Sequence, residues 1–246
     1  MAGIIILLIL SWLLLRLTEK QHRDVLGLLP ARSRLLQLLF GFFTAAACCA
    51  IYYQSFTLPA GNHWVFHRDF TASKMLGSAW WTFRSVLTEE LVFRGALLCI
   101  AIKFLGTKKA CLLSAGAFGI YHLFTMNAFG NPLQMFFLFC MTAVWGFMLA
   151  MAFAETRSLY LPIGIHFGWN LVNTVVFSRG PLGEQLFSLS GGKQLGGLLS
   201  LVVFLFQVFA VPVIVYAYQK KRGVAKQENM HRETRVLPHA AGTPRP

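Results

Sequence analysis

The chain has 246 residues, of which 56% are hydrophobic and 13% are charged, and its formal net charge is +13. This composition is too apolar for an ordinary soluble domain. Nucleic-acid binding is not expected either, because no soluble element carries a basic face. Lys and Arg lie between apolar blocks, where the positive-inside rule places them. The composition therefore predicts an integral membrane protein, with the lipid bilayer and no nucleic acid as a partner.

Seven apolar segments follow one another along the chain, and each is a candidate transmembrane helix. The first lacks the basic start and the cleavage site of a signal peptide, so we expect it to be retained. The sixth contains Pro162 and Gly164, which membrane helices tolerate when neighbouring helices satisfy the freed backbone groups. The segments are residues 3–17, 35–57, 80–102, 110–127, 133–153, 158–178 and 196–218. We expect an all-α, polytopic transmembrane protein of about seven spans around an intramembrane active-site cavity.

The distribution of Lys and Arg predicts how these spans are oriented. Basic residues concentrate in the first, third and fifth connections and in the C-terminal tail, and they are scarce in the alternate connections. By the positive-inside rule, the N-terminus is expected outside and the C-terminus in the cytoplasm, in a bacterial inner membrane. Residues 1–218 are expected to form a single transmembrane domain, and the basic, polar tail 219–246 is expected to be disordered.

Three of the apolar segments carry side chains that are costly to bury in lipid. These are Glu89, Glu90 and Arg94 in the third segment, His122 in the fourth, and His166 and Asn170 in the sixth. An ionised side chain at mid-bilayer costs about 3 kcal/mol, so such residues face the interior of the protein and usually have a function. We therefore expect the three segments to bring these side chains together.

Helical spacing suggests which of these residues form pairs. Glu90 and Arg94 are four residues apart, with Glu on the N-terminal side, which is the favoured order for a helical ion pair. Glu89 is rotated by about 100° from Glu90, so it does not share Arg94 equally. We assign Glu90 and Arg94 to support of the site and Glu89 to its chemistry. His166 and Asn170 are also four residues apart and lie on one face.

Two kinds of chemistry fit this set of side chains, and the sequence leaves both open. A carboxylate and an imidazole can deprotonate a water molecule, while a second His and an Asn amide donate hydrogen bonds to a developing oxyanion. Alternatively, Glu89, His122 and His166 bind Zn²⁺, with a water in the fourth position. In both cases water attacks a carbonyl group.

Other designs of intramembrane protease lack their residues in this chain. There is no Gly-x-Ser-x-Gly sequence for a serine nucleophile and no His-Glu-x-x-His sequence for a site-2-type zinc enzyme. The only aspartates, Asp24 and Asp69, are expected in loops. A pair of intramembrane aspartates is therefore excluded as the catalytic machinery.

Three motifs on separate segments resemble those of the CPBP family of intramembrane proteases. This family, also called the Abi family, contains CAAX prenyl proteases and bacteriocin-processing enzymes. Its pattern is Glu-Glu-x-x-x-Arg, then Phe-x-x-x-His, then His-x-x-x-Asn. The chain matches in that order, with Glu89-Glu90-x-x-x-Arg94, Phe118-x-x-x-His122 and His166-x-x-x-Asn170. The resemblance covers residues 80–178, and the first two segments and the last carry no motif.

The resemblance implies a role for each matching residue. Glu89 and His122 would activate the water, His166 and Asn170 would stabilise the tetrahedral intermediate, and Glu90 and Arg94 would support the site. A metal-dependent mechanism has also been argued for the family, so a zinc cofactor stays open. The implied substrate is a membrane-associated protein or peptide, cleaved by an endopeptidase.

Two other functions remain as alternatives. A proton-coupled transporter would use the same carboxylate and imidazoles as a relay, but the sequence has no inverted repeat of the kind that transporters contain. A non-catalytic membrane scaffold or immunity protein would keep the fold without the reaction. A second question concerns Arg84, near the outer end of its segment: its side chain either reaches the headgroups or binds a carboxylate of the substrate.

Overall fold

The computed structural model describes residues 2–18, 24–177, 185–191 and 193–236, and this part of the chain is mostly helical, as expected. Two short strands, β1 (His63–Phe66) and β2 (Phe187–Ser190), pair antiparallel. A π-helical stretch, η1 (Val172–Val176), directly follows α7. The α-helices are α1 (Ala2–Thr18), α2 (Arg32–Thr57), α3 (Ala72–Arg94), α4 (Ala96–Leu105), α5 (Thr107–Thr125), α6 (Pro132–Thr156), α7 (Tyr160–Leu171) and α8 (Gly197–Val236).

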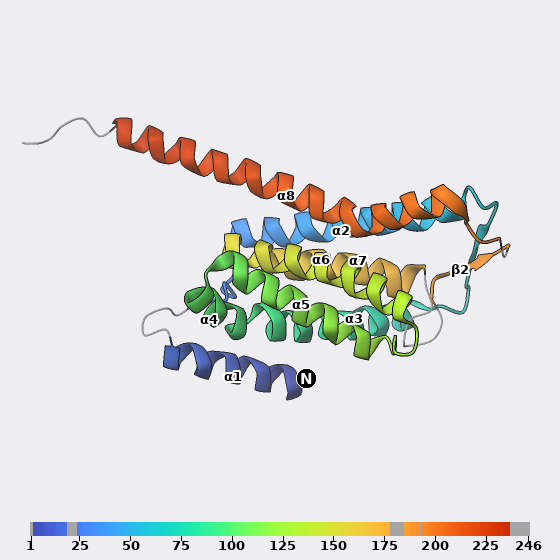
Figure 1. Cartoon of the computed structure of the whole chain (residues 1–246), viewed down its shortest axis with the longest axis horizontal. Helices are drawn as coiled ribbons and strands as arrows, with labels where there is room; N and C mark the ends of the chain where they lie inside the picture. The colour runs from blue at the N-terminus through green and yellow to red at the C-terminus, as the bar shows by residue number, and fades with distance from the viewer. Residues whose placement is uncertain (1, 19–23, 178–184, 192, 237–246) are drawn as a thin grey trace, which may run out of the picture.

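The long helices run roughly along one direction and form a bundle (Figure 1). In the middle, α7 packs against α2 and α3, and α6 packs against α5. Helix α1 lies at one edge against α3 and α4, and α8 lies at the other edge against α2 and α6. The β1–β2 sheet closes one end of the bundle, while the C-terminal part of α8 extends beyond the opposite end (Figure 1).

Three helices in the described part of the chain are long and apolar enough to cross a membrane: α2, α6 and residues Gly197–Val224 of α8. Helix α1 is a shorter apolar helix. Ionisable residues make α3 less apolar, and α7 ends after 12 residues, where η1 begins. The count of about seven spans is therefore not confirmed and stays a prediction, whereas a mainly α-helical membrane protein is supported.

The segment expected as one span at 80–102 consists of two helices. Helix α3 begins at Ala72, earlier than expected, and ends at Arg94, and α4 follows after Gly95. A Cβ atom on Gly95 would lie 2.1 Å from the carbonyl oxygen of Leu91, so only glycine fits this break. The break places the Glu89, Glu90 and Arg94 side chains in the last turns of α3.

Two glycines on α7 determine how closely that helix approaches α2. A Cβ atom would lie 2.2 Å from the Leu38 carbonyl oxygen if added to Gly164, and 2.2 Å from the Phe42 carbonyl oxygen if added to Gly168. Small residues at this four-residue spacing let membrane helices pack backbone to backbone. Because His166 lies between the two glycines, this contact also fixes the direction in which its side chain points.

We expect Gly168→Ala to destabilise the protein by about 1–3 kcal/mol, the usual cost of forcing a methyl group into a packed interface. The matched control is Gly116→Ala on α5, where an added Cβ atom meets nothing within 4 Å. That substitution should leave stability unchanged or raise it, because alanine favours helix over glycine. Thermal unfolding of both variants in detergent measures the difference. Equal melting temperatures would show that the α2–α7 contact is not tight.

Two parts of the structure differ from the expectation. The small β1–β2 sheet was not expected from an all-α reading, because each strand has only four residues within a connection. Helix α8 continues to Val236, past residue 219 where the polar tail was expected to begin, and the expected disorder of the tail stays a prediction. This region contains few helix-breaking residues, and it directly extends an apolar helix. Residues 237–246 lie outside the described part of the chain.

Candidate active site

Helices α3, α5 and α7 carry the polar residues that the motifs single out. The Glu90 and Arg94 side chains are fully buried, and the His166 and Glu89 side chains are 7% and 13% exposed. Apolar packing surrounds them: Leu91, two residues from Glu89, belongs to one buried cluster, and Ile165, beside His166, belongs to another. The site therefore lies in the interior of the bundle and not on a lipid-facing surface.

Glu90 and Arg94 form the expected ion pair within α3, with 3.1 Å between Glu90 Oε1 and Arg94 Nη1. Arg94 also donates from Nη2 to the carbonyl oxygen of Gly146 on α6, at 3.3 Å. Its guanidinium carbon lies 4.2 Å from the centre of the Phe118 ring, which is within cation–π range. Arg94 thus connects α3, α5 and α6 in the buried interior of the bundle.

His166 lies between the two glutamates. Its Nδ1 is 2.7 Å from Glu90 Oε1, and its Nε2 is 3.8 Å from Glu89 Oε2. Since a carboxylate only accepts, His166 donates the Nδ1 proton to Glu90, which fixes the orientation of the imidazole. Sequence reasoning missed this contact and treated Glu90 only as the partner of Arg94. Glu90 therefore holds both Arg94 and His166.

Glu89 keeps one carboxylate oxygen without a protein donor. Ser85 Oγ lies 3.3 Å from Glu89 Oε1, within hydrogen-bond distance, and it comes from the preceding turn of α3. Glu89 Oε2 is buried and, within the described residues, has no hydrogen-bond partner. A buried carboxylate oxygen without a donor is unusual, and water or substrate is the natural partner for it. The 3.8 Å gap to His166 Nε2 is short enough for one water molecule to contact both atoms.

In the described part of the chain, His122 on α5 has a hydrogen-bond partner at only one of its two ring nitrogens. Its Nδ1 donates to the carbonyl oxygen of Phe118, at 2.9 Å, which leaves Nε2 as the acceptor. The His122 ring also contacts the Phe118 ring, with 4.3 Å between the ring centres. Phe118, the first residue of the second motif, therefore holds His122 through both its backbone and its side chain.

A cavity of about 150 Å³ lies between α5, α6, α7 and α8, and three of the expected catalytic residues line it. One wall is apolar, formed by Trp145 and Trp169, whose ring centres are 4.7 Å apart. A volume of this size accommodates several water molecules, at about 30 Å³ each. The polar residues that line the cavity are His122, Thr142, His166, Asn170, Asn173 and Gln207.

Glu89 lines a second cavity, of about 280 Å³, between α1, α3 and α5. Arg84, Ser85 and Thr88 line it as well, and Arg84 is exposed. The structure therefore brings Glu89 next to His166 but separates Glu89 from the cavity that His122, His166 and Asn170 share. The sequence indicated which residues gather, but it did not indicate that His166 stands between two cavities.

The expected zinc ligands are Glu89, His122 and His166. Among the residues that the structure describes, no group of three or more His, Cys, Asp or Glu side chains is placed to bind a metal ion. Zinc requires its ligand atoms at about 2.0–2.3 Å from one centre. Glu89, His122 and His166 do not fit this requirement as they lie here.

The fold and the site together define a class: a helical integral membrane protein that holds carboxylates and imidazoles among apolar helices. Residues 71–172, from the end of the β1–α3 connection to the first residue of η1, match the Rce1-like family, described as type II CAAX prenyl endopeptidase Rce1-like. This match confirms the resemblance to the CPBP proteases, although it spans less than half of the chain. No curated protein and no solved structure matches the chain.

Proposed function

We propose that the protein is an intramembrane endopeptidase of the CAAX-protease type that hydrolyses a peptide bond in a membrane-associated protein or peptide. The matched family is a protease family, which supports a peptidase with a peptide or protein substrate. The observation that carries the proposal is the position of His166, hydrogen-bonded to Glu90 and adjacent to Glu89, at the edge of the cavity that His122 and Asn170 line.

In the proposed mechanism, the carboxylate of Glu89 and Nε2 of His122 remove a proton from a water molecule beside His166, the residue that is adjacent to Glu89 and lines the cavity of His122. The water oxygen attacks the carbonyl carbon of the scissile peptide bond and forms a tetrahedral oxyanion. Asn170 and protonated His166 donate hydrogen bonds to this oxyanion. The carbon–nitrogen bond then breaks, and the proton taken from water passes to the leaving amine. Glu90 orients His166, and Arg94 neutralises Glu90.

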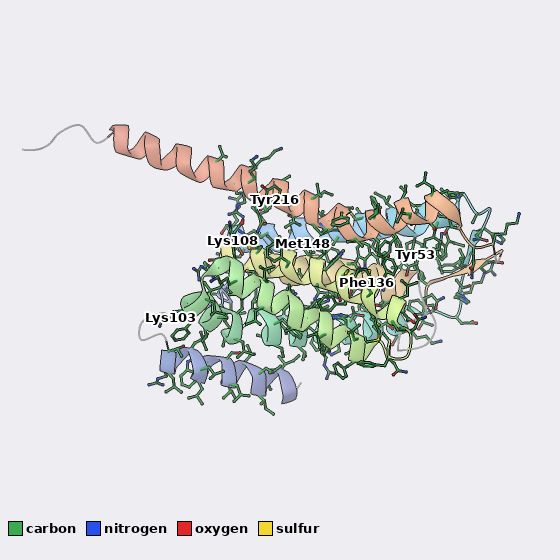
Figure 2. The ribbon with its side chains drawn as sticks, viewed as in Figure 1. Tyr53, Lys103, Lys108, Phe136, Met148 and Tyr216 are labelled. Carbon is green, nitrogen blue, oxygen red and sulfur yellow. The ribbon has the colours of Figure 1, made fainter. Side chains whose placement is uncertain are left out.

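The proposed orientation has the N-terminus outside and the C-terminus in the cytoplasm, in a bacterial inner membrane. One structural feature is in agreement with it. Lys103 and Lys108 lie at one end of the bundle, whereas Tyr53 lies toward the other (Figure 2). The basic end is also the end beyond which α8 extends (Figure 1). Both lysines and the C-terminal tail would then face the cytoplasm, as the positive-inside rule requires.

The test of the proposed function compares the membrane peptides of cells that carry the wild-type protein with those of cells that carry Glu89→Gln. We expect at least one full-length membrane polypeptide to accumulate in the variant and its cleaved form to be missing. Purified wild-type protein should then cleave that polypeptide in detergent. A scaffold or immunity protein predicts identical peptide profiles, and a proton-coupled transporter predicts uptake driven by a proton gradient in proteoliposomes.

A further inference from the structure

Gln207 is an isolated polar residue on an apolar helix. From residue 201 to residue 215 of α8, its side chain is the only one that can form a hydrogen bond. This helix lies outside the residues that match the protease family. A carboxamide at this position is unfavourable in a membrane, because a polar group without a hydrogen-bond partner is destabilising in an apolar medium.

The backbone of Gln207 is fixed to the site by a neighbouring helix. Trp145 Nε1 on α6 donates to the carbonyl oxygen of Gln207, at 3.2 Å. The Trp145 ring also packs edge-on against Trp169 of α7. Gly146, the next residue after Trp145, accepts the hydrogen bond from Arg94. The position of Gln207 is therefore set by the same part of α6 that contacts the buried ion pair.

Gln207 is one of the residues that line the cavity shared by His122, His166 and Asn170. Within the part of the chain that the structure describes, its carboxamide makes no hydrogen bond. By contrast, the other hydrogen-bonding side chain near the start of α8, Ser200, is satisfied by the carbonyl oxygen of Gly197, at 2.9 Å. The Gln207 carboxamide thus has one acceptor and two donors available, on a residue that lines the cavity.

We infer that Gln207 binds the backbone of the substrate and positions an extended peptide next to His122 and His166. A carboxamide has the same donor and acceptor groups as a peptide bond, so it pairs with any extended peptide regardless of sequence. Apolar residues of the same cavity, including Met126, Leu138 and Met141, then contact the side chains of the substrate. This inference rests on the proposed function, and it makes α8 part of the substrate site.

The test uses Gln207→Met, which keeps the length of the side chain and removes its hydrogen-bonding groups. The substrate is the polypeptide that accumulates in the Glu89→Gln cells. We expect KM to rise about tenfold, the value of one or two lost hydrogen bonds, and kcat to change less than about twofold. In the non-cleaving Glu89→Gln background, Gln207→Met should weaken binding of the same polypeptide by a similar factor. Ser200→Ala is the matched control and should change neither quantity.

A thermal unfolding measurement separates substrate binding from a structural role. Because the carboxamide makes no hydrogen bond within the described residues, Gln207→Met should leave the melting temperature of the free protein unchanged or raise it. A lower melting temperature with an unchanged KM would overturn the inference. The inference would also be overturned if Gln207→Met changed neither KM nor the affinity for the polypeptide while Glu89→Gln abolished cleavage. Cleavage by Glu89→Gln at the wild-type rate would instead refute the proposed function itself.

Discussion

Glu89→Gln is expected to lower the rate of peptide cleavage about a thousandfold while the protein stays folded in the membrane. The amide has nearly the same shape as the carboxylate, and Ser85 can still contact it. It cannot take a proton from water, and general-base catalysis contributes about 10²–10⁴-fold to the rate. Single-turnover cleavage of the accumulated polypeptide, with purified protein in detergent, measures the ratio of the two cleavage rates.

Glu155→Gln is the matched control for this variant, because Glu155 is an exposed glutamate near the end of α6, outside both cavities at the site. It should cleave at the wild-type rate. If Glu89→Gln and Glu155→Gln were equally active, Glu89 would have no part in the chemistry.

Arg94→Met is expected to destabilise the protein by about 3–5 kcal/mol, because it leaves the carboxylate of Glu90 buried without its charge partner. Both side chains of this pair are 0% exposed, so water cannot replace the lost interaction. The hydrogen bond to the Gly146 carbonyl and the contact with Phe118 are lost as well. Unfolding in mixed detergent and SDS measures the change in free energy.

The double variant Glu90→Gln with Arg94→Met tests the reason for that loss. Glutamine keeps an acceptor for His166 Nδ1 and removes the buried charge, so the double variant should recover much of the stability. If the double variant were as unstable as Arg94→Met alone, the packing of the Arg94 side chain, and not its charge, would explain the effect.

The sequence predicted the contacts that lie within one helix. Glu90 and Arg94 are separated by one helical turn, so their pairing follows from the spacing alone. The contact between His166 and Glu90 joins residues that are 76 positions apart in the sequence. It depends on the rotation of α7 against α3, which is fixed by the approach of Gly164 and Gly168 to α2. The glycines were visible in the sequence, but their partner helix was not.

For the end of α3, the two strands and Gln207, the sequence pattern was compatible with more than one interpretation. Gly95 ends α3, yet membrane helices often contain glycine without breaking. The two strands have only four residues each, which is the shortest length at which alternation indicates a strand. Gln207 is the one polar side chain in an apolar run, but the last segment carries no family motif, so the motifs do not point to this residue. Glu89 lines a different cavity from His122, His166 and Asn170 because of where α1 and α5 lie. No local sequence pattern predicts the position of these helices.

The central claim is that Glu89 and His122 act together on one water molecule. The most direct measurement is the single-turnover cleavage rate of Glu89→Gln, His122→Ala and the variant with both changes. Within the described residues, His122 forms no hydrogen bond or ion pair with Glu90 or Arg94, so its removal spares the buried pair. If the two groups form one unit, the double variant should be no slower than the slower single variant. Losses that multiply in the double variant would contradict the account.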